Sequence, residues 1–376
     1  MPTDTEVKNE RTMELPVIDL EPYLRCSGRL DRAGDDAAAT NFSPDEQKLL
    51  CQKVASSFRD MGALIVRDPR CLAQDNDRFL DMMEEFFQKS DEFKLRQERP
   101  SLHYQVGVTP GGVEVPRSAF DKEMCRKASL LAEESRPLIP TGPDRKWRYM
   151  WRIGPRPART SFKELNAEPV IPEGFPDWVD VMNGWGSKMI AAVEVVAEMA
   201  AIGFDLPPET FTALMFQGPN LLAPTGSDLE KDGKEGTILA GYHYDLNFLT
   251  IHGRSRFPCL FIWVKNGQKL EVAVPPGCLL LQTGKQFEWL TGGTCPAGMH
   301  EVVVNKRTVE AIQSAVKAKR SLWRVSSTVF GHIASDAILQ PLGHFANAPD
   351  AHKYPAMRAG EYVEAELSDI NLKGNK

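Results

Sequence analysis

Apolar positions recur with two different periods along the chain, and this difference separates a helix-rich first half from a strand-rich second half. Between residues 44 and 61, Leu50, Val54 and Phe58 recur at intervals of four, which places them on one face of a helix. Residues 63–66 then form a short, continuous apolar run of the length of a buried strand. We therefore expect a helix over 44–61 followed directly by a strand.

Two more helices are predicted before residue 205. The stretch from about 75 to 95 carries Phe79 and Met83 on one side, and a longer 3.6-residue period runs through 175–204. Leu206-Pro207-Pro208 follows as a break, because proline cannot continue a helix. Apolar stripes of this kind are typical of core packing, so we expect these helices to support a sheet.

The pattern changes after residue 205 to short apolar runs separated by glycine, proline and asparagine. Residues 259–264, 270–274 and 278–281 are such runs, and turn-forming residues lie between them at 265–268 and 275–277. Many short strands at this spacing indicate a β-sandwich or barrel. The whole chain is therefore predicted to be an α+β protein.

Composition narrows the class of protein. The 376 residues are 42% hydrophobic and 26% charged, as in an ordinary globular protein. The net charge of −6 argues against a nucleic-acid partner, and no apolar run reaches the roughly 18 residues of a membrane span. The seven cysteines form no C-x-x-C pair, and residues 1–16 lack the apolar core of a secretory signal. We expect reduced thiols, a cytoplasmic location, no membrane association, and a monomer or weak homo-oligomer.

The candidate chemistry begins with His243 and Asp245, which are two positions apart and are followed by an apolar run over 246–251. If this segment is a strand, residues i and i+2 point to the same face. An imidazole and a carboxylate that converge provide two of the three ligands of a 2-His-1-carboxylate site, which suits non-haem Fe(II). Taken alone, the pair is weak evidence, since His-x-Asp occurs by chance.

A third ligand is expected on a later strand of the same β-rich region. His300 fits this place because it opens the apolar run 300–304 after a glycine-rich segment. The 57 positions between His243 and His300 leave room for about four strands, and in a jelly roll the later strand can return beside the first. For His252, His332 and His344 a core or surface position without chemistry is the simpler interpretation.

A second pair with the same spacing is Arg324 and Ser326. On one strand they share a face, and an arginine directed into a barrel needs an anion, because a buried unpaired charge is costly. A guanidinium next to a hydroxyl suits a carboxylate. The alternative is an internal salt bridge, and without the upstream metal ligands it would be the preferred interpretation.

Basic and aromatic residues alternate over 145–159. A half-exposed strand with a solvated face is the preferred interpretation, while binding of single-stranded nucleic acid by stacking and charge is the weaker one. A third interpretation has Arg148 or Arg152 facing a pocket and meeting an anionic substrate.

These motifs together resemble one family. The order H-x-D, then H, then R-x-S is similar to the isopenicillin N synthase-like branch of the Fe(II)/2-oxoglutarate-dependent dioxygenases. The segments 15–20, 58–66 and 281–293 also resemble that branch, and 354–362 resembles its C-terminal helix. The resemblance covers most of the chain and implies a double-stranded β-helix (jelly roll, cupin-like) core flanked by supporting helices.

The resemblance also implies a division of the chain and roles for the candidate residues. An N-terminal helix and strand region over 14–204 would pack on a jelly-roll core over 205–345, followed by a tail or helix over 346–376. The implied metal ligands for Fe(II) are His243, Asp245 and His300, and the implied contacts of 2-oxoglutarate are Arg324 and Ser326.

The expected reaction uses O2 and oxidises a small, possibly anionic molecule by hydroxylation, desaturation or cyclisation, with release of succinate and CO2. The closest alternative is an Fe(II) oxidase like isopenicillin N synthase or aminocyclopropane-carboxylate oxidase, in which Arg324 and Ser326 would bind the substrate's own carboxylate. A catalytically silent protein with the same fold is the alternative from another class.

Three departures from the family pattern are visible. Lys285 stands where the family usually has aspartate. The 24 positions from His300 to Arg324 are about twice the usual gap, and the extra segment 306–320 has the pattern of an inserted helix before a strand over 322–329. The family's Asn-Tyr pair is not recognisable near residues 215–216.

Overall fold

The computed structural model describes residues 14–30 and 42–373. Its α-helices have the following bounds: α1 Glu21–Cys26, α2 Pro44–Met61, α3 Ala73–Gln88, α4 Asp91–Leu95, α5 Lys122–Ser129, α6 Trp178–Gly203, α7 Thr212–Met215, α8 Leu229–Asp232, α9 Lys285–Leu290, α10 Lys306–Lys317 and α11 Ala359–Asp369. Its strands have these bounds: β1 Val17–Asp19, β2 Ala63–Arg67, β3 Gly107–Thr109, β4 Trp147–Arg152, β5 Leu221–Leu222, β6 Thr225–Asp228, β7 Ile238–Tyr244, β8 Leu249–His252, β9 Leu260–Trp263, β10 Lys269–Glu271, β11 Cys278–Thr283, β12 Met299–Val303, β13 Trp323–Val325, β14 Thr328–Gly331, β15 Ile338–Leu339 and β16 Met357–Arg358.

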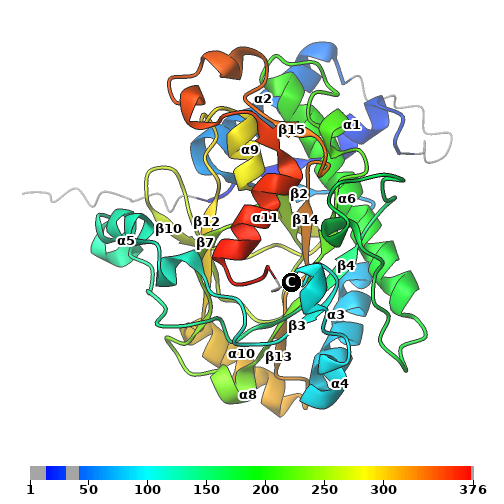
Figure 1. Ribbon diagram of the computed structural model, residues 1–376, viewed down its shortest axis with the longest axis vertical. Coiled ribbons are helices and arrows are strands. Elements are labelled where there is room, and N and C mark those ends of the chain that lie inside the picture. Colours follow the sequence, from blue (N-terminus) through cyan, green and yellow to red (C-terminus); the bar gives the residue numbers. More distant parts are fainter. Residues whose placement is uncertain (1–13, 31–41, 374–376) are drawn as a thin grey trace, which may run out of the picture.

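Two sheets form the β-rich core. The larger sheet has the order β1-β2-β11-β8-β14-β5-β4-β6-β13, with β3 paired to β4, and the smaller has the order β10-β9-β12-β7. Strands of both sheets line the same cavity, so the cavity lies between them. Helices surround this core, with α2 and α6 together on one side and α8 and α10 at the opposite end in Figure 1. The fold is the predicted α+β jelly roll with supporting helices.

The first part of the chain is built into this core and does not merely cover it. Strand β2 lies between β1 and β11, and β4 pairs with both β5 and β6. Because these hydrogen bonds join segments on both sides of residue 204, the division into 14–204, 205–345 and 346–376 stays an interpretation.

Helix α2 has the predicted bounds because both of its ends are specified locally. The Ser43 hydroxyl accepts a hydrogen bond from the Glu46 backbone amide at 3.2 Å, and the Glu46 carboxylate accepts one from the Ser43 amide at 2.8 Å. This reciprocal cap satisfies amides at the start of the helix. Gly62 ends it with a φ of 68°, a left-handed conformation that glycine adopts without strain. The predicted strand follows as β2.

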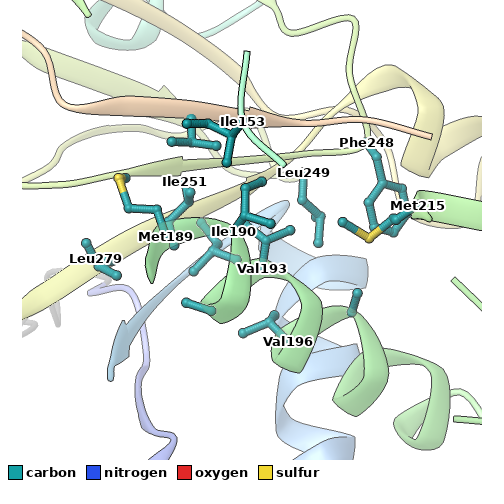
Figure 2. Packing of buried hydrophobic residues seen from close by; sticks show 14 of the residues in the cluster. Ile153, Met189, Ile190, Val193, Val196, Met215, Phe248, Leu249, Ile251 and Leu279 are labelled. Atoms are coloured by element: carbon teal, nitrogen blue, oxygen red, sulfur yellow. The ribbon is translucent and has the colours of Figure 1, made fainter. Parts of the chain in front are cut away.

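Helix α6 is the main support of the sheet. Figure 2 shows Met189, Ile190 and Val193 packed toward Leu249 and Ile251 of β8, and all of these side chains are buried. The helix is apolar around most of its circumference because α2 covers its other side.

Three predicted elements differ in the structure. The helix expected over about 75–95 is two helices, because Ser90 leaves the helical path and caps α4 by accepting a hydrogen bond from the Phe93 amide at 3.2 Å. The strand expected over 322–329 is likewise two strands, β13 and β14. Strand β4 was expected to have a solvated face, but its residues are buried from Arg148 onward, since it lies inside the larger sheet.

The C-terminal helix also begins later than the resemblance implied. Residues 354–362 contain the short strand β16, and α11 starts only at Ala359. In Figure 1 α11 crosses in front of the strands and leads to the C-terminus near β3. Glu366, Leu367, Ile370 and Leu372 line the cavity between the sheets. The end of the chain therefore contributes to the wall of the cavity. The inserted segment 306–320 contains α10.

Candidate active site

His243 and His300 are brought together by the register of the smaller sheet. Strands β7 and β12 are antiparallel, and these two histidines are direct cross-strand partners. Side chains of opposed residues project from the same face of a sheet, and the two ring centroids are 4.2 Å apart. The long-range pairing inferred from spacing is present. Along the sequence, β8, β9, β10 and β11 lie between β7 and β12.

Asp245 reaches the same point from just beyond the end of β7. Its Oδ1 lies 3.7 Å from Nε2 of His243 and 3.7 Å from Nε2 of His300. The strand ends at Tyr244, so the shared strand face is not what aligns His243 and Asp245. Instead, the Thr250 hydroxyl donates a 2.6 Å hydrogen bond to Oδ2, which leaves Oδ1 directed at the two imidazoles.

The protonation of this group suits a divalent cation. Nδ1 of His243 lies 2.6 Å from the Gly241 carbonyl, which can only accept, so the proton is on Nδ1 and the Nε2 lone pair is free. Burial and then the neighbouring His300 hold the pKa of His243 well below its ordinary value. Burial raises the pKa of Asp245, but His300, His243 and the Thr250 hydrogen bond outweigh it, so the net pKa is lowered.

Two nitrogens and one carboxylate oxygen therefore meet within 4.8 Å of one another. A neutral imidazole and an ionised carboxylate are the forms that bind a metal, and this donor set fits Fe(II). A second group with suitable spacing, His103, Glu164 and Glu364, also occurs among the described residues. There, however, Glu364 has its own cationic partner, Lys373, at 3.0 Å.

Arg324 and Ser326 line the same cavity as the three candidate ligands. Arg324 is 5% exposed, its Nε has no hydrogen-bond partner, and the described residues provide it with no carboxylate ion pair. The Ser326 hydroxyl accepts from the Thr225 amide at 2.9 Å and from the Thr225 hydroxyl at 2.8 Å, so its own hydrogen remains available. The salt-bridge alternative from the sequence finds no partner in this part of the chain.

The two basic residues singled out in β4 have different surroundings. Arg148 lines the cavity and pairs with Glu114. Arg152 instead donates to the backbone carbonyls of Pro155 at 3.2 Å and Gln217 at 3.4 Å, and it is not among the cavity-lining residues. Burial lowers the pKa of each guanidinium to about 10. Arg148 thus matches the pocket interpretation, and Arg152 is a structural residue.

Several charged residues of the cavity wall were not found from the sequence. Lys146 pairs with Asp144 and lies 3.3 Å from Glu114, and Arg117 lies 2.8 Å from Glu366 of α11. Each is an ordinary charged residue in its local sequence, and only the meeting of distant segments gives it a place in the wall. No local signal identifies them.

Two of the histidines that the sequence treated as structural also line the cavity. These are His252 on β8 and His332 beyond β14. Burial lowers the pKa of His332 to about 3, and burial followed by the charge of His300 lowers that of His252 to about 4. Both imidazoles are therefore neutral in the protein. Lys285, the departure from the family pattern, donates its backbone amide to the Asp245 carbonyl at 2.8 Å.

Comparison with known proteins identifies the family that this chain resembles. A model of the 2OG-Fe(II) oxygenase superfamily matches residues 226–333. A 2-oxoglutarate-dependent dioxygenase of Gibberella zeae is 28% identical over 277 residues, which are 71% of this chain and 67% of that protein. The chain is similar to the 2OG-Fe(II) oxygenases. This similarity and the group formed by His243, Asp245 and His300 support Fe(II) and 2-oxoglutarate as cofactors, with O2 as oxidant, and the resemblance inferred from the sequence is confirmed at the level of the superfamily.

Solved structures confirm the fold of the oxygenase. A full-length Neurospora crassa protein, solved in complex with alpha-KG, superposes with a TM-score of 0.70, at 17% identity, covering 96% of this chain and 98% of that one. JOX2 in complex with 2OG, Fe and JA gives a TM-score of 0.63 at 16% identity, covering 96% and 86% of the two chains. At these identities the likeness establishes the jelly-roll fold only.

Proposed function

We propose that the oxygenase holds Fe(II) on His243, Asp245 and His300 and oxidises a C–H bond of a small-molecule substrate while 2-oxoglutarate is converted to succinate and CO2. Hydroxylation is the default outcome, and desaturation or ring closure can follow on the same site. The observation that carries this proposal is the convergence of two imidazoles and one carboxylate on one point of a cavity.

Within this proposal each protein group has a defined task. Bound Fe(II) supplies the chemistry that couples O2 to the oxidation of both 2-oxoglutarate and the substrate. Thr250 fixes the orientation of Asp245, and the Gly241 carbonyl fixes the tautomer of His243. Arg324 and Ser326 bind the carboxylate of 2-oxoglutarate that is far from the metal, since the guanidinium and the hydroxyl both have N–H or O–H groups to donate.

For the substrate, we propose a small molecule with an anionic or strongly polar group near Arg148. The Nε of this buried arginine has no hydrogen-bond partner, although its charge is balanced by Glu114. The substitution Arg148→Met is then expected to raise the KM of a substrate that carries a carboxylate, and to leave that of its neutral amide little changed. Equal effects on both compounds would argue against a role in recognition.

The rival reaction is an Fe(II) oxidase without 2-oxoglutarate, in which Arg324 and Ser326 bind the substrate. The superfamily match and the curated relative favour 2-oxoglutarate. No helix in the described part of the chain has the length and apolar character of a membrane span. A cytoplasmic location and a monomeric or weakly associated state stay predictions.

The deciding experiment is an anaerobic titration of the Fe(II)-loaded protein with 2-oxoglutarate. Chelation of the metal by a 2-oxo acid gives a visible charge-transfer band, and we expect this band to saturate with added 2-oxoglutarate. In air, the same protein should release succinate. Absence of both signals, in protein shown to hold one equivalent of Fe(II), would reject the proposal and favour the oxidase.

A further inference from the structure

An additional histidine lies beside the proposed metal ligands in the same cavity. His252 ends β8, and its ring centroid is 6.2 Å from that of His300. It lines the cavity together with Arg324 and Ser326. Arg324 is also close enough to contribute, after burial and His300, to the lowered pKa of His252. The ring therefore lies near both a proposed metal ligand and the arginine.

One nitrogen of this ring is held by the protein and the other is not. Strands β8 and β14 place His252 opposite Thr328, and Nδ1 lies 3.0 Å from the Thr328 hydroxyl. Nε2 is buried and has no hydrogen-bond partner among the described residues; the Gln282 side chain is near enough to affect the pKa of His252, but its amide also lacks a hydrogen-bond partner in this part of the chain. A buried polar atom without a partner costs about 1–3 kcal/mol, so a partner from outside the protein is expected.

The direction of the Thr328 hydrogen bond fixes what Nε2 can do. A threonine hydroxyl can donate to Nδ1, and the imidazole then carries its hydrogen on Nε2. No other acceptor is recorded for the Thr328 hydroxyl among the described hydrogen bonds, so donation to Nδ1 satisfies both groups. In this tautomer, Nε2–H is a buried donor of a cavity-lining residue.

We propose that His252 is a positioning residue for 2-oxoglutarate, donating an Nε2–H hydrogen bond to a carboxylate oxygen of the bound co-substrate. The inference rests on the proposed function, in which 2-oxoglutarate extends from the metal to Arg324. His252 lines the cavity that the co-substrate would then occupy. The contact satisfies the unpartnered Nε2, and its geometry is set in advance by Thr328.

The test compares His252→Leu, which removes the donor, with His252→Gln, which places an amide N–H at a similar distance from the backbone. The control is His352→Leu, a change at an exposed histidine outside the cavity. The dissociation constants of Fe(II) and of 2-oxoglutarate are measured separately under anaerobic conditions. Thermal unfolding of each variant is recorded alongside.

We expect His252→Leu to weaken 2-oxoglutarate binding by roughly tenfold or more, the effect of one hydrogen bond to a charged group. Fe(II) affinity should stay within about twofold of the wild type, because the ring is not a proposed ligand. His252→Gln should recover most of the lost affinity. Unchanged 2-oxoglutarate binding in His252→Leu would overturn the inference, as would a parallel loss of Fe(II), which indicates a role in holding His300.

A second variant covers the case in which His252→Leu does not fold. Thr328→Val keeps the imidazole but removes the hydroxyl that sets its tautomer. We expect a smaller weakening of 2-oxoglutarate binding with unchanged Fe(II) affinity, and no weakening would count against the inference. If the wild-type protein itself binds Fe(II) but not 2-oxoglutarate, the proposed function fails. If it binds both and the variants behave as wild type, only the role of His252 fails.

Discussion

The two ends of the cavity differ in how their polar groups are satisfied. At the metal end, the Arg324 Nε and the His252 Nε2 are buried without partners, and the three proposed ligands point at one another. In another part of the cavity wall, the paired end, charged side chains are paired within the protein, as in Lys146 with Asp144 and Arg148 with Glu114, and these cations are near enough to interact with His243 and Asp245. Buried groups without partners indicate where a ligand completes the structure, whereas charges that are paired within the protein are balanced without one. At the paired end, the unpartnered Nε of Arg148 is the position where a polar group of the substrate would bind.

The two ends also come from different parts of the chain. All of the proposed metal and 2-oxoglutarate contacts lie within residues 226–333, the region that the superfamily model matches. The paired end is built from the segments 114–117 and 144–148 and from α11, all outside that region. The shared chemistry thus resides in the matched strands, and the features particular to this oxygenase reside in the segments that close over them.

The largest expected effect breaks the metal end. His243→Ala should abolish stoichiometric Fe(II) binding and all succinate release, because two remaining ligands do not hold the metal in this geometry. The control is His352→Ala, at an exposed histidine, which should bind Fe(II) as the wild type does. Metal content after anaerobic gel filtration measures both. Full Fe(II) retention in His243→Ala would remove this residue from the proposed site.

The metal end could be predicted from the sequence because its signals are local or periodic. The H-x-D spacing, a histidine opening an apolar strand, and R-x-S each constrain a side chain through strand geometry. Even there, the two residues converge as predicted, but a shared strand face is not the reason. Asp245 leaves the strand, and the Thr250 hydroxyl orients it.

The paired end could not be predicted, because it depends on pairings between distant segments. Nothing in the sequence around Glu114 or Lys146 indicates that these residues meet, or that β4 is buried inside the larger sheet. Alternating basic and aromatic residues over 145–159 look like a solvated strand when neighbours are unknown. His252 was missed for the same reason, since only the three-dimensional structure shows that one of its nitrogens lacks a partner.

The next effect tests whether the ion pairs of the paired end stabilise the folded protein. Asp144 accepts from Lys146 and also from the Gly241 amide at 3.0 Å, two residues before His243. Asp144→Ala should lower the free energy of unfolding by about 3 kcal/mol, the lower part of the range for breaking a buried ion pair, because Lys146 keeps Glu114. Chemical denaturation of the metal-free protein measures it. Asp144→Asn, which retains an acceptor for Gly241, should recover part of the loss, and a neutral effect of Asp144→Ala would show that the pairing is not structural.

The third effect tests the metal end, where buried groups lack partners. Arg324→Gln should weaken 2-oxoglutarate binding by about 1.5–3 kcal/mol, as for a lost hydrogen bond to a charged group. Arg324→Met should leave the 2-oxoglutarate-free protein as stable as the wild type or more stable, because a buried charge without an ion-pair partner is removed. Anaerobic titration measures the affinity for 2-oxoglutarate, and thermal unfolding measures the stability.

Arg320→Met, at an exposed arginine, is the control for loss of positive charge. A clear loss of stability in Arg324→Met would mean that the protein itself supplies a partner, and the contrast between the two ends would weaken.

The smallest effect concerns the closure of the paired end by α11. Arg117 lies 2.8 Å from both Glu366 and Asp369 of this helix. Asp369 is about half exposed to water, and the mostly buried Glu366 can take up a proton when the arginine is lost, so Arg117→Met should cost about 1 kcal/mol. Burial raises the pKa of Glu366 and Arg117 lowers it, so the pKa rises further in the variant. A raised pKa favours the protonated form in the folded state, so the associated stability is present at low pH and is lost as the pH rises through the folded-state pKa.

The loss of stability in Arg117→Met should therefore be larger at pH 8 than at pH 5. Faster amide exchange in α11 would show it, while 2-oxoglutarate affinity stays unchanged. Arg126→Met, which breaks a fully exposed pair with Glu123, should show neither change. If Arg117→Met alters 2-oxoglutarate binding as strongly as Arg324→Gln does, the two ends of the cavity are not separate in function.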